Sequence, residues 1–378
     1  MKKQIELAIT PDEINLPEIL LTKSFQNLNL DKEKISSVVP IRKSIDARSR
    51  HIVFRILVDV YIDEKPEAKK PIAYNPVGDT KKVIVVGFGP GGMFAALKLI
   101  ELGIKPIIIE RGKDVQLRRR DIRAIQQDHI VNPDSNYCFG EGGAGAYSDG
   151  KLYTRSTKRG DVNRIIDILI QHGADPEIAI DTHPHIGSNR LPKIVAALRK
   201  TILDNGGEIY FNSKVDDFIL KDNRLIGVKI NSQQEMFGDA VILATGHSAR
   251  DIYYLLNKKN IRIEPKPFAM GVRIEHPQAL INEIRYHTKE KHPNLPSAAY
   301  TLVTDVEKRG VYSFCMCPGG IIVPAATSPG EIVVNGMSLS STFSPSFNSL
   351  SRAQIPIIPK ILKILLATIL LTASALLP

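Results

Sequence analysis

The stretch Val83-Ile84-Val85-Val86-Gly87-Phe88-Gly89-Pro90-Gly91-Gly92 decides how the central part of this chain folds. Its four leading apolar residues predict a strand that is buried on both faces. The spacing of apolar residues over 93–102 predicts a helix that ends at Gly103, and a second apolar run follows at 106–109. The sequence therefore predicts a strand–helix–strand unit with its glycines in the first turn.

The glycines of this turn follow the G-x-G-x-x-G pattern of dinucleotide-binding folds. Gly87 allows a tight turn, Gly89 leaves room for a pyrophosphate, and Gly92 lets the helix approach the strand. Glu110 lies 23 residues after Gly87, at the end of the second strand. A carboxylate there can accept hydrogen bonds from both ribose hydroxyls and would repel a 2′-phosphate. The alternative is an unrelated α/β turn followed by a Glu that occurs by chance.

The glycine pattern occurs a second time at 140–145, in Gly-Glu-Gly-Gly-Ala-Gly. No apolar strand precedes it and no helical pattern follows it, so it does not predict a second nucleotide fold. We expect a flexible loop that brings main-chain N–H groups close to a flat or charged ligand. An ordinary surface loop is the alternative.

Three further regions surround this unit. Residues 1–75 predict a small α+β module, with a helix at 17–28, a strand at 52–61 and a proline-containing linker after it. Residues 80–260 form the predicted discontinuous Rossmann-like domain, in which 194–203 is a helix, 208–211 a strand, 214–220 and 225–230 antiparallel strands, and 239–244 a buried strand. Residues 261–340 are expected to be part of a substrate or cap domain.

Several motifs resemble those of flavin-binding proteins. The apolar strand that ends in Ala244-Thr245-Gly246 resembles the strand that closes the nucleotide domain in the glutathione-reductase-like FAD-binding fold. The stretch 206–215 resembles the segment whose last residue meets the adenine ring through its main chain. The motifs at 137–145, 148–152, 185–187, 273–277 and 315–320 resemble a group of bacterial FAD-dependent proteins, often labelled NAD(P)/FAD-dependent dehydrogenases.

This resemblance implies an α/β fold class: an FAD/NAD(P)-binding Rossmann-like domain with an inserted mixed α+β substrate domain and a small N-terminal α+β module. It implies an FAD-dependent oxidoreductase with an unknown small-molecule substrate, and NAD(P)H as a transient electron donor is an open option. A non-catalytic or inactive nucleotide-binding fragment and a tail-anchored membrane-associated binding protein are the alternatives. The residues expected to contact FAD are Gly87, Gly89, Gly91, Gly92, Glu110, Arg111, Gly142, Gly143, Ser148, Val215, Ala244, Thr245 and Gly246.

The composition excludes several classes of protein. The chain has 378 residues, with 50 Lys and Arg against 40 Asp and Glu, a formal charge of +10. Its 43% apolar and 24% charged residues exclude wholesale disorder and collagen-like repeats. Three cysteines exclude a disulfide scaffold and fit a reducing compartment, which favours the cytoplasm. The arginine cluster at 118–123 has no interleaved aromatic residues, so it predicts a solvated or phosphate-facing helix and not a nucleic-acid site.

The catalytic residues are not decided by the sequence. Cys315 and Cys317 form a Cys-x-Cys pair, which fits structural or ligand-wall thiols and also a redox pair. With Cys138 they are too few for the four ligands of a structural zinc site, and no metal is expected. His247 follows the Ala-Thr-Gly turn and is expected near the cofactor. His183, His185 and His276 are further acid–base candidates. Each of these four histidines, taken alone, more often has a structural role.

The last segment, 341–378, differs from the rest. It has no acidic residue and no Gly, it starts rich in Ser, and its final fifteen residues are uncharged. A membrane-spanning helix needs about 20 apolar residues, so an anchor would be short. The family resemblance stops near Ser340, where family members continue with their last FAD contacts. We therefore expect a frameshift or premature end, and membrane contact only if the apolar tail is genuine.

Overall fold

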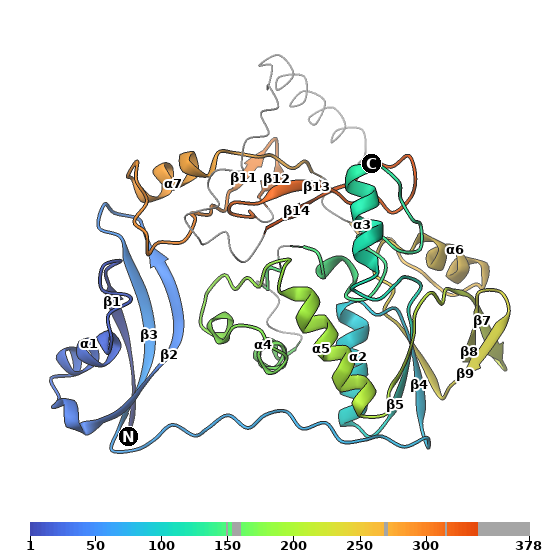
Figure 1. Cartoon of the computed structure of the whole chain (residues 1–378), viewed down its shortest axis with the longest axis horizontal. Coiled ribbons are helices and arrows are strands. Elements are labelled where there is room, and N and C mark those ends of the chain that lie inside the picture. Colours follow the sequence, from blue (N-terminus) through green and yellow to red (C-terminus); the bar gives the residue numbers. More distant parts are fainter. Residues whose placement is uncertain (149, 153–159, 268–270, 314–315, 339–378) are drawn as a thin grey trace, which may run out of the picture. The chain divides into compact units, whose positions relative to one another are not determined.

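The structure is a computed structural model, and it describes residues 1–148, 150–152, 160–267, 271–313 and 316–338 (Figure 1). The expectations for Cys315 and for the tail at 341–378 lie outside the described residues. Among the described helices, none combines the length and the apolar character that crossing a membrane requires.

A parallel sheet of four strands in the order β10-β4-β5-β6 forms the centre of the fold. Its strands are β4 (Lys82–Val86), β5 (Lys105–Ile109), β6 (Glu208–Tyr210) and β10 (Ala240–Leu243). The expected strand–helix–strand unit is confirmed, because helix α2 (Pro90–Glu101) joins β4 to the parallel β5. The expectation that β10 is buried is wrong: it lies at the edge of the described sheet, and Leu243 is 39% exposed.

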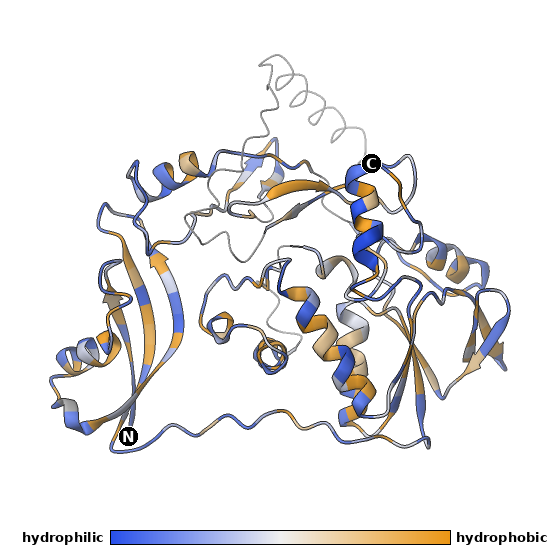
Figure 2. Ribbon diagram, in the orientation of Figure 1, coloured by the Kyte–Doolittle hydropathy of each residue, from blue (hydrophilic) through white to orange (hydrophobic). Residues whose placement is uncertain are grey.

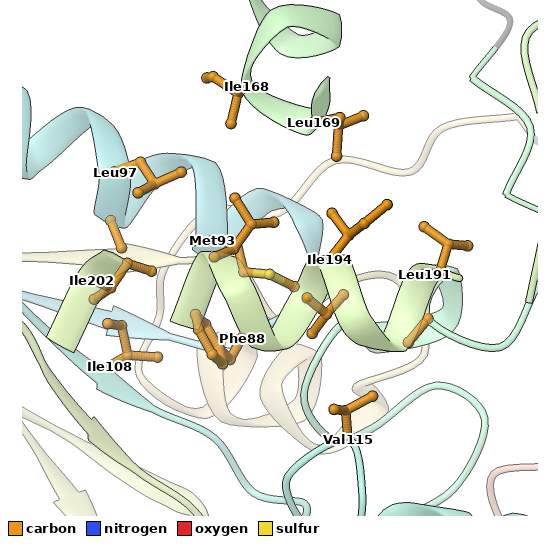
Figure 3. Packing of buried hydrophobic residues seen from close by; sticks show 14 of the residues in the cluster. Phe88, Met93, Leu97, Ile108, Val115, Ile168, Leu169, Leu191, Ile194 and Ile202 are labelled. Carbon is orange, nitrogen blue, oxygen red and sulfur yellow. The ribbon is translucent and has the colours of Figure 1, made fainter. Parts of the chain in front are cut away.

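Helices α2 and α5 (Leu191–Asp204) pack together with the central sheet around one apolar core. Figure 3 shows Phe88 and Met93 beside Ile194 and Ile202 of α5, with Ile108 of β5 close by. These side chains are almost fully buried, and each such burial contributes about 1.5–3 kcal/mol. Figure 2 shows the same apolar character along the strands of the sheet. This core fixes the position of the turn between β4 and α2.

A second, antiparallel sheet lies between β6 and β10 in the sequence. It contains β7 (Val215–Lys221), β8 (Arg224–Ile230) and β9 (Gln234–Phe237), in that order. The predicted antiparallel pair at 214–220 and 225–230 is thus confirmed. Helix α6 (Arg250–Lys258) follows β10 and packs on this sheet through Ile252 and Leu255.

The N-terminal region forms its own three-stranded antiparallel sheet, in the order β1-β3-β2. It contains β1 (Lys2–Ile9), α1 (Ile19–Leu28), the 3₁₀ turn η1 (Lys32–Lys34), β2 (Ile35–Asp46) and β3 (Val53–Ile62). The expected helix at 17–28 and strand at 52–61 are confirmed to within a few residues. The main chain of Lys43 in β2 exchanges two hydrogen bonds with residues 180 and 182, which follow the 3₁₀ turn η3 (Pro176–Ala179).

The remaining described elements are short. Helix α3 (Arg118–Gln127) and the 3₁₀ turn η2 (Gly143–Gly145) follow β5, and helix α4 (Val162–Gln171) precedes η3. After α6 come α7 (Gln278–Tyr286) and two hairpins. One hairpin pairs β11 (Val303–Val306) with β12 (Arg309–Tyr312), and the other pairs β13 (Ile321–Pro324) with β14 (Val334–Met337).

Candidate cofactor site

One pocket opens at the carboxyl ends of β4, β5 and β10. In a parallel sheet these ends lie on one edge, where α/β proteins bind their ligands. The pocket is lined by the turn between β4 and α2, by residues 109–111 at the end of β5, by the second glycine loop and by the start of β7. Residues 244–249, 251 and 252, which follow β10, complete the lining. Segments up to about 160 residues apart in sequence therefore contribute to one site.

The turn between β4 and α2 needs its glycines for different reasons. Gly87 has a φ of +101°, and its N–H donates to the carbonyl of Ile109 at 2.8 Å. A Cβ at Gly92 would lie 1.9 Å from the carbonyl oxygen of Gly87, so α2 could not start this close to the strand with any other residue. The first turn of α2 therefore begins at the pocket, where its free N–H groups favour an anion.

Glu110 joins three loops through its buried carboxylate. One oxygen accepts the N–H of Phe88 at 2.7 Å, and the other accepts the N–H groups of Gly112 and Gly140, both at 2.9 Å. A carboxylate has about four sites for hydrogen bonds. Three are used within the protein, which leaves room for one bond to a ribose. The protein's own hydrogen bonds thus favour one ribose bond over the expected two, and contact of Glu110 with a ribose stays a prediction.

The second glycine loop is held by Arg118, whose side chain is completely buried. All five N–H groups of its guanidinium donate to main-chain carbonyls, those of Asn136, Tyr137, Gly140, Glu141 and Gly143, at 2.7–3.3 Å. Burial lowers the pKa of the guanidinium. A Cβ at Gly140 would lie 2.6 Å from Cδ of Arg118, so the loop wraps the arginine closely only because this position is Gly.

This arrangement corrects two expectations. Arg118 belongs to neither a solvated nor a phosphate-facing surface, although its neighbours Arg119, Arg120 and Arg123 are exposed. The glycine loop is also tied down rather than presented freely. The N–H groups of Glu141 and Gly142 donate to the carbonyls of Lys113 and Phe88, at 3.0 and 2.8 Å.

Glu141 is a fully buried carboxyl within this loop. One oxygen accepts the N–H of Val115 at 2.7 Å and a guanidinium N–H of Arg199 at 3.0 Å. The other oxygen has no hydrogen-bond partner among the described residues. Burial raises the pKa of Glu141 to about 7, against the attraction of Arg199.

Arg111 lies at the wall of the pocket within a network of charges. Its guanidinium donates to Asp134 at 2.6 and 3.0 Å and to Asp251 at 3.0 Å, and it lies 4.4 Å from the ring centroid of Phe139. The ammonium of Lys214 lies 3.5 Å from Asp251. Two carboxylates thus hold Arg111 in place beside the end of β5.

The Ala-Thr-Gly turn after β10 completes the pocket. The N–H of Ala244 donates to the carbonyl of Val86 at 2.8 Å, so this turn lies directly beside the first glycine turn. His247 lies at the pocket and is exposed. The hydroxyl of Ser248 lies 3.4 Å from Sγ of Cys138, which also lines the pocket.

The structure brings most of the expected cofactor residues together. The lining includes Gly87, Gly89, Gly91, Glu110, Arg111, Gly143, Val215, Ala244, Thr245 and Gly246. Three others lie outside it. Gly92 packs against Gly87, the N–H of Gly142 bonds Phe88, and the hydroxyl of Ser148 donates to the carbonyl of Gly145 at 2.8 Å. Contact with a cofactor stays a prediction for all thirteen residues.

Sequence reasoning missed several residues of the site. Ser213, Lys214 and Asp251 line the pocket. Arg118 does not line it but donates hydrogen bonds to the loop that does. Arg118 stands in a run of arginines whose other members are exposed, so only the helical spacing to the buried Ile122 and Ile125 signals its burial. Cys317 does not line this pocket. Among the described residues, no group of three or more His, Cys, Asp or Glu is placed to hold a metal ion.

The parallel sheet and the pocket at its carboxyl edge define an α/β protein of the Rossmann-like class. The chain belongs to the FAD-dependent protein family. The family model described as FAD-dependent protein, C-terminal domain-like, matches residues 267–355, and a domain of unknown function matches 1–61. An uncharacterized protein of Clostridium beijerinckii is 40% identical over 368 residues, which cover 91% of this chain and 68% of that protein.

Two further similarities are more distant. A thiamine thiazole synthase of Aeropyrum pernix is 27% identical over 150 residues, covering 39% of this chain and 43% of that enzyme. The crystal structure of Thermovibrio ammonificans THI4 is 18% identical, with a TM-score of 0.31, and covers 48% of this chain and 64% of that chain.

Proposed function

We propose that this chain is an FAD-dependent oxidoreductase that binds the adenosine diphosphate part of FAD in the pocket at the carboxyl ends of β4, β5 and β10. The observation that carries the proposal is the meeting of three features at this pocket. They are the first glycine turn with the start of α2, the carboxylate of Glu110, and the Ala-Thr-Gly turn. Each feature alone is common, but their meeting at one edge of a parallel sheet supports a dinucleotide.

The residues of the pocket fit such a cofactor. The N-terminus of α2 would hold the pyrophosphate, because its free N–H groups and the absence of side chains at Gly87 and Gly89 favour a closely approaching anion. Glu110 has one remaining acceptor site for a ribose hydroxyl. Val215 also lines the pocket, and the resemblance implies that its main chain meets the adenine.

The flavin would then extend along the second glycine loop, whose residues 143–145 line the pocket. FAD supplies the hydride and electron chemistry when it is bound. The loop would shape the wall beside it, and Arg118 would fix the loop. The substrate is not specified by these residues. Among the described residues there is one four-stranded parallel sheet, so we propose that NAD(P)H, if it is the donor, approaches the flavin without a nucleotide domain of its own.

A competition experiment on the purified full chain tests the proposal. Adenosine diphosphate should displace FAD from the protein, as followed by the return of flavin fluorescence. Adenosine 2′,5′-bisphosphate should displace FAD at least tenfold less well than adenosine 5′-monophosphate, because its additional 2′-phosphate meets the buried carboxylate of Glu110. Equal displacement by both would contradict the assigned role of Glu110, and a chain that never retains FAD would support the inactive-fragment alternative.

A further test concerns the reaction class. Under anaerobic conditions, NADH or NADPH should bleach the flavin absorbance near 450 nm in the loaded protein, while dithionite serves as the positive control. Bleaching by dithionite alone would leave the oxidoreductase proposal standing but would remove the nicotinamide donor from it.

A further inference from the structure

Several of the other motifs that resemble the family lie close together outside the cofactor pocket. The segment 150–152 pairs with 184–186, through hydrogen bonds from Leu152 to Pro184 and from Ile186 to Gly150. The N–H of Ser188 in turn donates to the carbonyl of Ser338 at 3.1 Å. The motif at 273–277 is joined to the β13–β14 hairpin, because Glu275 accepts the N–H of Ile322 at 2.7 Å.

Cys317 lies within this convergence and has two cationic side chains beside it. The ammonium of Lys151 lies 3.6 Å from its sulfur. A Cβ added at Gly336 would lie 2.9 Å from the sulfur and 2.8 Å from Nη1 of Arg273. The thiol and the guanidinium therefore border the same small space beside Gly336. A hydrogen bond from Nη2 of Arg273 to Oδ1 of Asn335, at 2.7 Å, holds the guanidinium there.

Two glycines make room for the sulfur. A Cβ at Gly320 would lie 2.8 Å from Cβ of Cys317, and one at Gly336 would meet the sulfur itself. The other titratable groups of the surrounding segments are engaged elsewhere. His185 lies 3.0 Å from the hydroxyl of Ser338, and Glu275 is bonded to the main chain of Ile322. Among the described residues, the cations of Lys151 and Arg273 lie beside the sulfur.

We propose that Cys317 is held as a thiolate by Lys151 and Arg273 and is a nucleophile that attacks soft electrophiles. Adjacent cations favour the ionised form of a thiol, and the ionised form is the nucleophile. The site is half-buried, which gives a small reagent access to the sulfur. This proposal does not depend on the proposed flavin chemistry, because it concerns a thiol outside the cofactor pocket.

Alkylation by iodoacetamide tests the proposal directly. The sulfur forms a bond to carbon as the carbon–iodine bond breaks, iodide leaves with the electron pair, and no proton has to move from an ionised thiol. The experiment uses the full chain with Cys315→Ser, and peptide mass spectrometry follows Cys317 and Cys138 separately against pH. Cys138 is the comparison thiol: it is also half-buried, its sulfur accepts from the hydroxyl of Ser248, and the charge that acts on it is that of the buried Arg118.

We expect Cys317 to react at least tenfold faster than Cys138 at pH 7, with a midpoint below the value of about 8.5 of an ordinary thiol. Lys151→Met should move this midpoint up by at least about one pH unit, and Lys151→Arg should restore most of it. Lys214→Met, at the cofactor pocket, should change nothing at Cys317. Equal rates for the two thiols, or a midpoint that Lys151→Met leaves unchanged in folded protein, would overturn the proposal.

Discussion

At the scale of single residues, the fully buried Arg118 holds one wall of the candidate site in place. Arg118 uses all five of its N–H groups on carbonyls of one loop, and that loop forms a wall of the pocket. Carbonyls that lose such a donor inside the protein stay unpartnered, and each costs about 1–3 kcal/mol. The hydrogen bonds of this one side chain therefore hold the loop in its conformation.

Replacing Arg118 with Lys should destabilise the protein strongly. An ammonium has three donors and no planar fork, so at least two carbonyls lose their bond. We expect a loss of at least about 3 kcal/mol in the free energy of unfolding, measured by urea denaturation. Arg120→Lys on the exposed side of α3 is the control and should stay within about 0.5 kcal/mol. Similar stabilities for the two variants would contradict the assigned role.

Glu141 should make the stability of the protein depend on pH. Its pKa is about 7 in the folded protein, because burial disfavours the charged form, against an ordinary value of 4.5. A raised acid pKa means that the folded state binds the proton more tightly. The free energy of unfolding therefore falls as the pH rises from about 4.5 to 7, and the full penalty is present above pH 7.

Glu141→Gln should remove this penalty. At pH 8 the variant should be more stable than the parent chain by about 1–3 kcal/mol, and the difference should vanish near pH 4.5. Thermal unfolding across this pH range measures the effect. Glu67→Gln, at an exposed position, is the control and should show no trend. A variant that is equally or less stable at pH 8 would mean that Arg199 keeps Glu141 ionised.

At the scale of elements, the contact between α2 and the first glycine turn determines where the pocket lies. Two neighbouring glycines at the start of α2 differ in what a methyl group would meet. At Gly92 the added Cβ would lie 1.9 Å from a carbonyl oxygen, whereas at Gly91 it would be 3.8 Å from the side chain of Ala244. The first contact is impossible without moving the helix, and the second is ordinary van der Waals contact.

The pair Gly92→Ala and Gly91→Ala tests this contact. Gly92→Ala should lower the free energy of unfolding by at least about 2 kcal/mol, because the helix must move away from the strand. Gly91→Ala should be neutral or stabilising by up to about 1 kcal/mol, since Ala favours a helix over Gly. Differential scanning calorimetry of both variants decides the matter, and a tolerated Gly92→Ala would show that α2 does not depend on this approach.

The elements themselves could largely be predicted from the sequence. The apolar runs of β4 and β5 and the spacing of α2 give strong local patterns, so these bounds agree to within a few residues. The edge position and partial exposure of β10 could not be predicted, because an apolar run does not tell whether a strand has one neighbour or two. The lining residues Ser213 and Lys214 follow β6 directly and carry no motif.

At the scale of the whole molecule, the described residues bring two sets of motifs to two places. The glycine turn, Glu110 and the Ala-Thr-Gly turn meet at the pocket, while the motifs around Lys151, Arg273 and Cys317 meet beside the β13–β14 hairpin. Which segments meet depends on long-range pairing, such as β10 on β4. Sequence patterns are local. They therefore identify most of these residues as parts of motifs, but they do not show which distant segments come into contact.

The most direct test of the central claim is a titration of the purified full chain with FAD. We expect saturable binding with one FAD per chain, seen as quenched flavin fluorescence. Glu110→Gln should weaken this binding at least tenfold, because it removes the charge that joins three loops at the pocket. Glu101→Gln, at the far end of α2, is the control and should bind normally. A folded chain that leaves excess FAD unquenched, or a Glu110→Gln variant that binds FAD as tightly as the parent chain, would contradict this account.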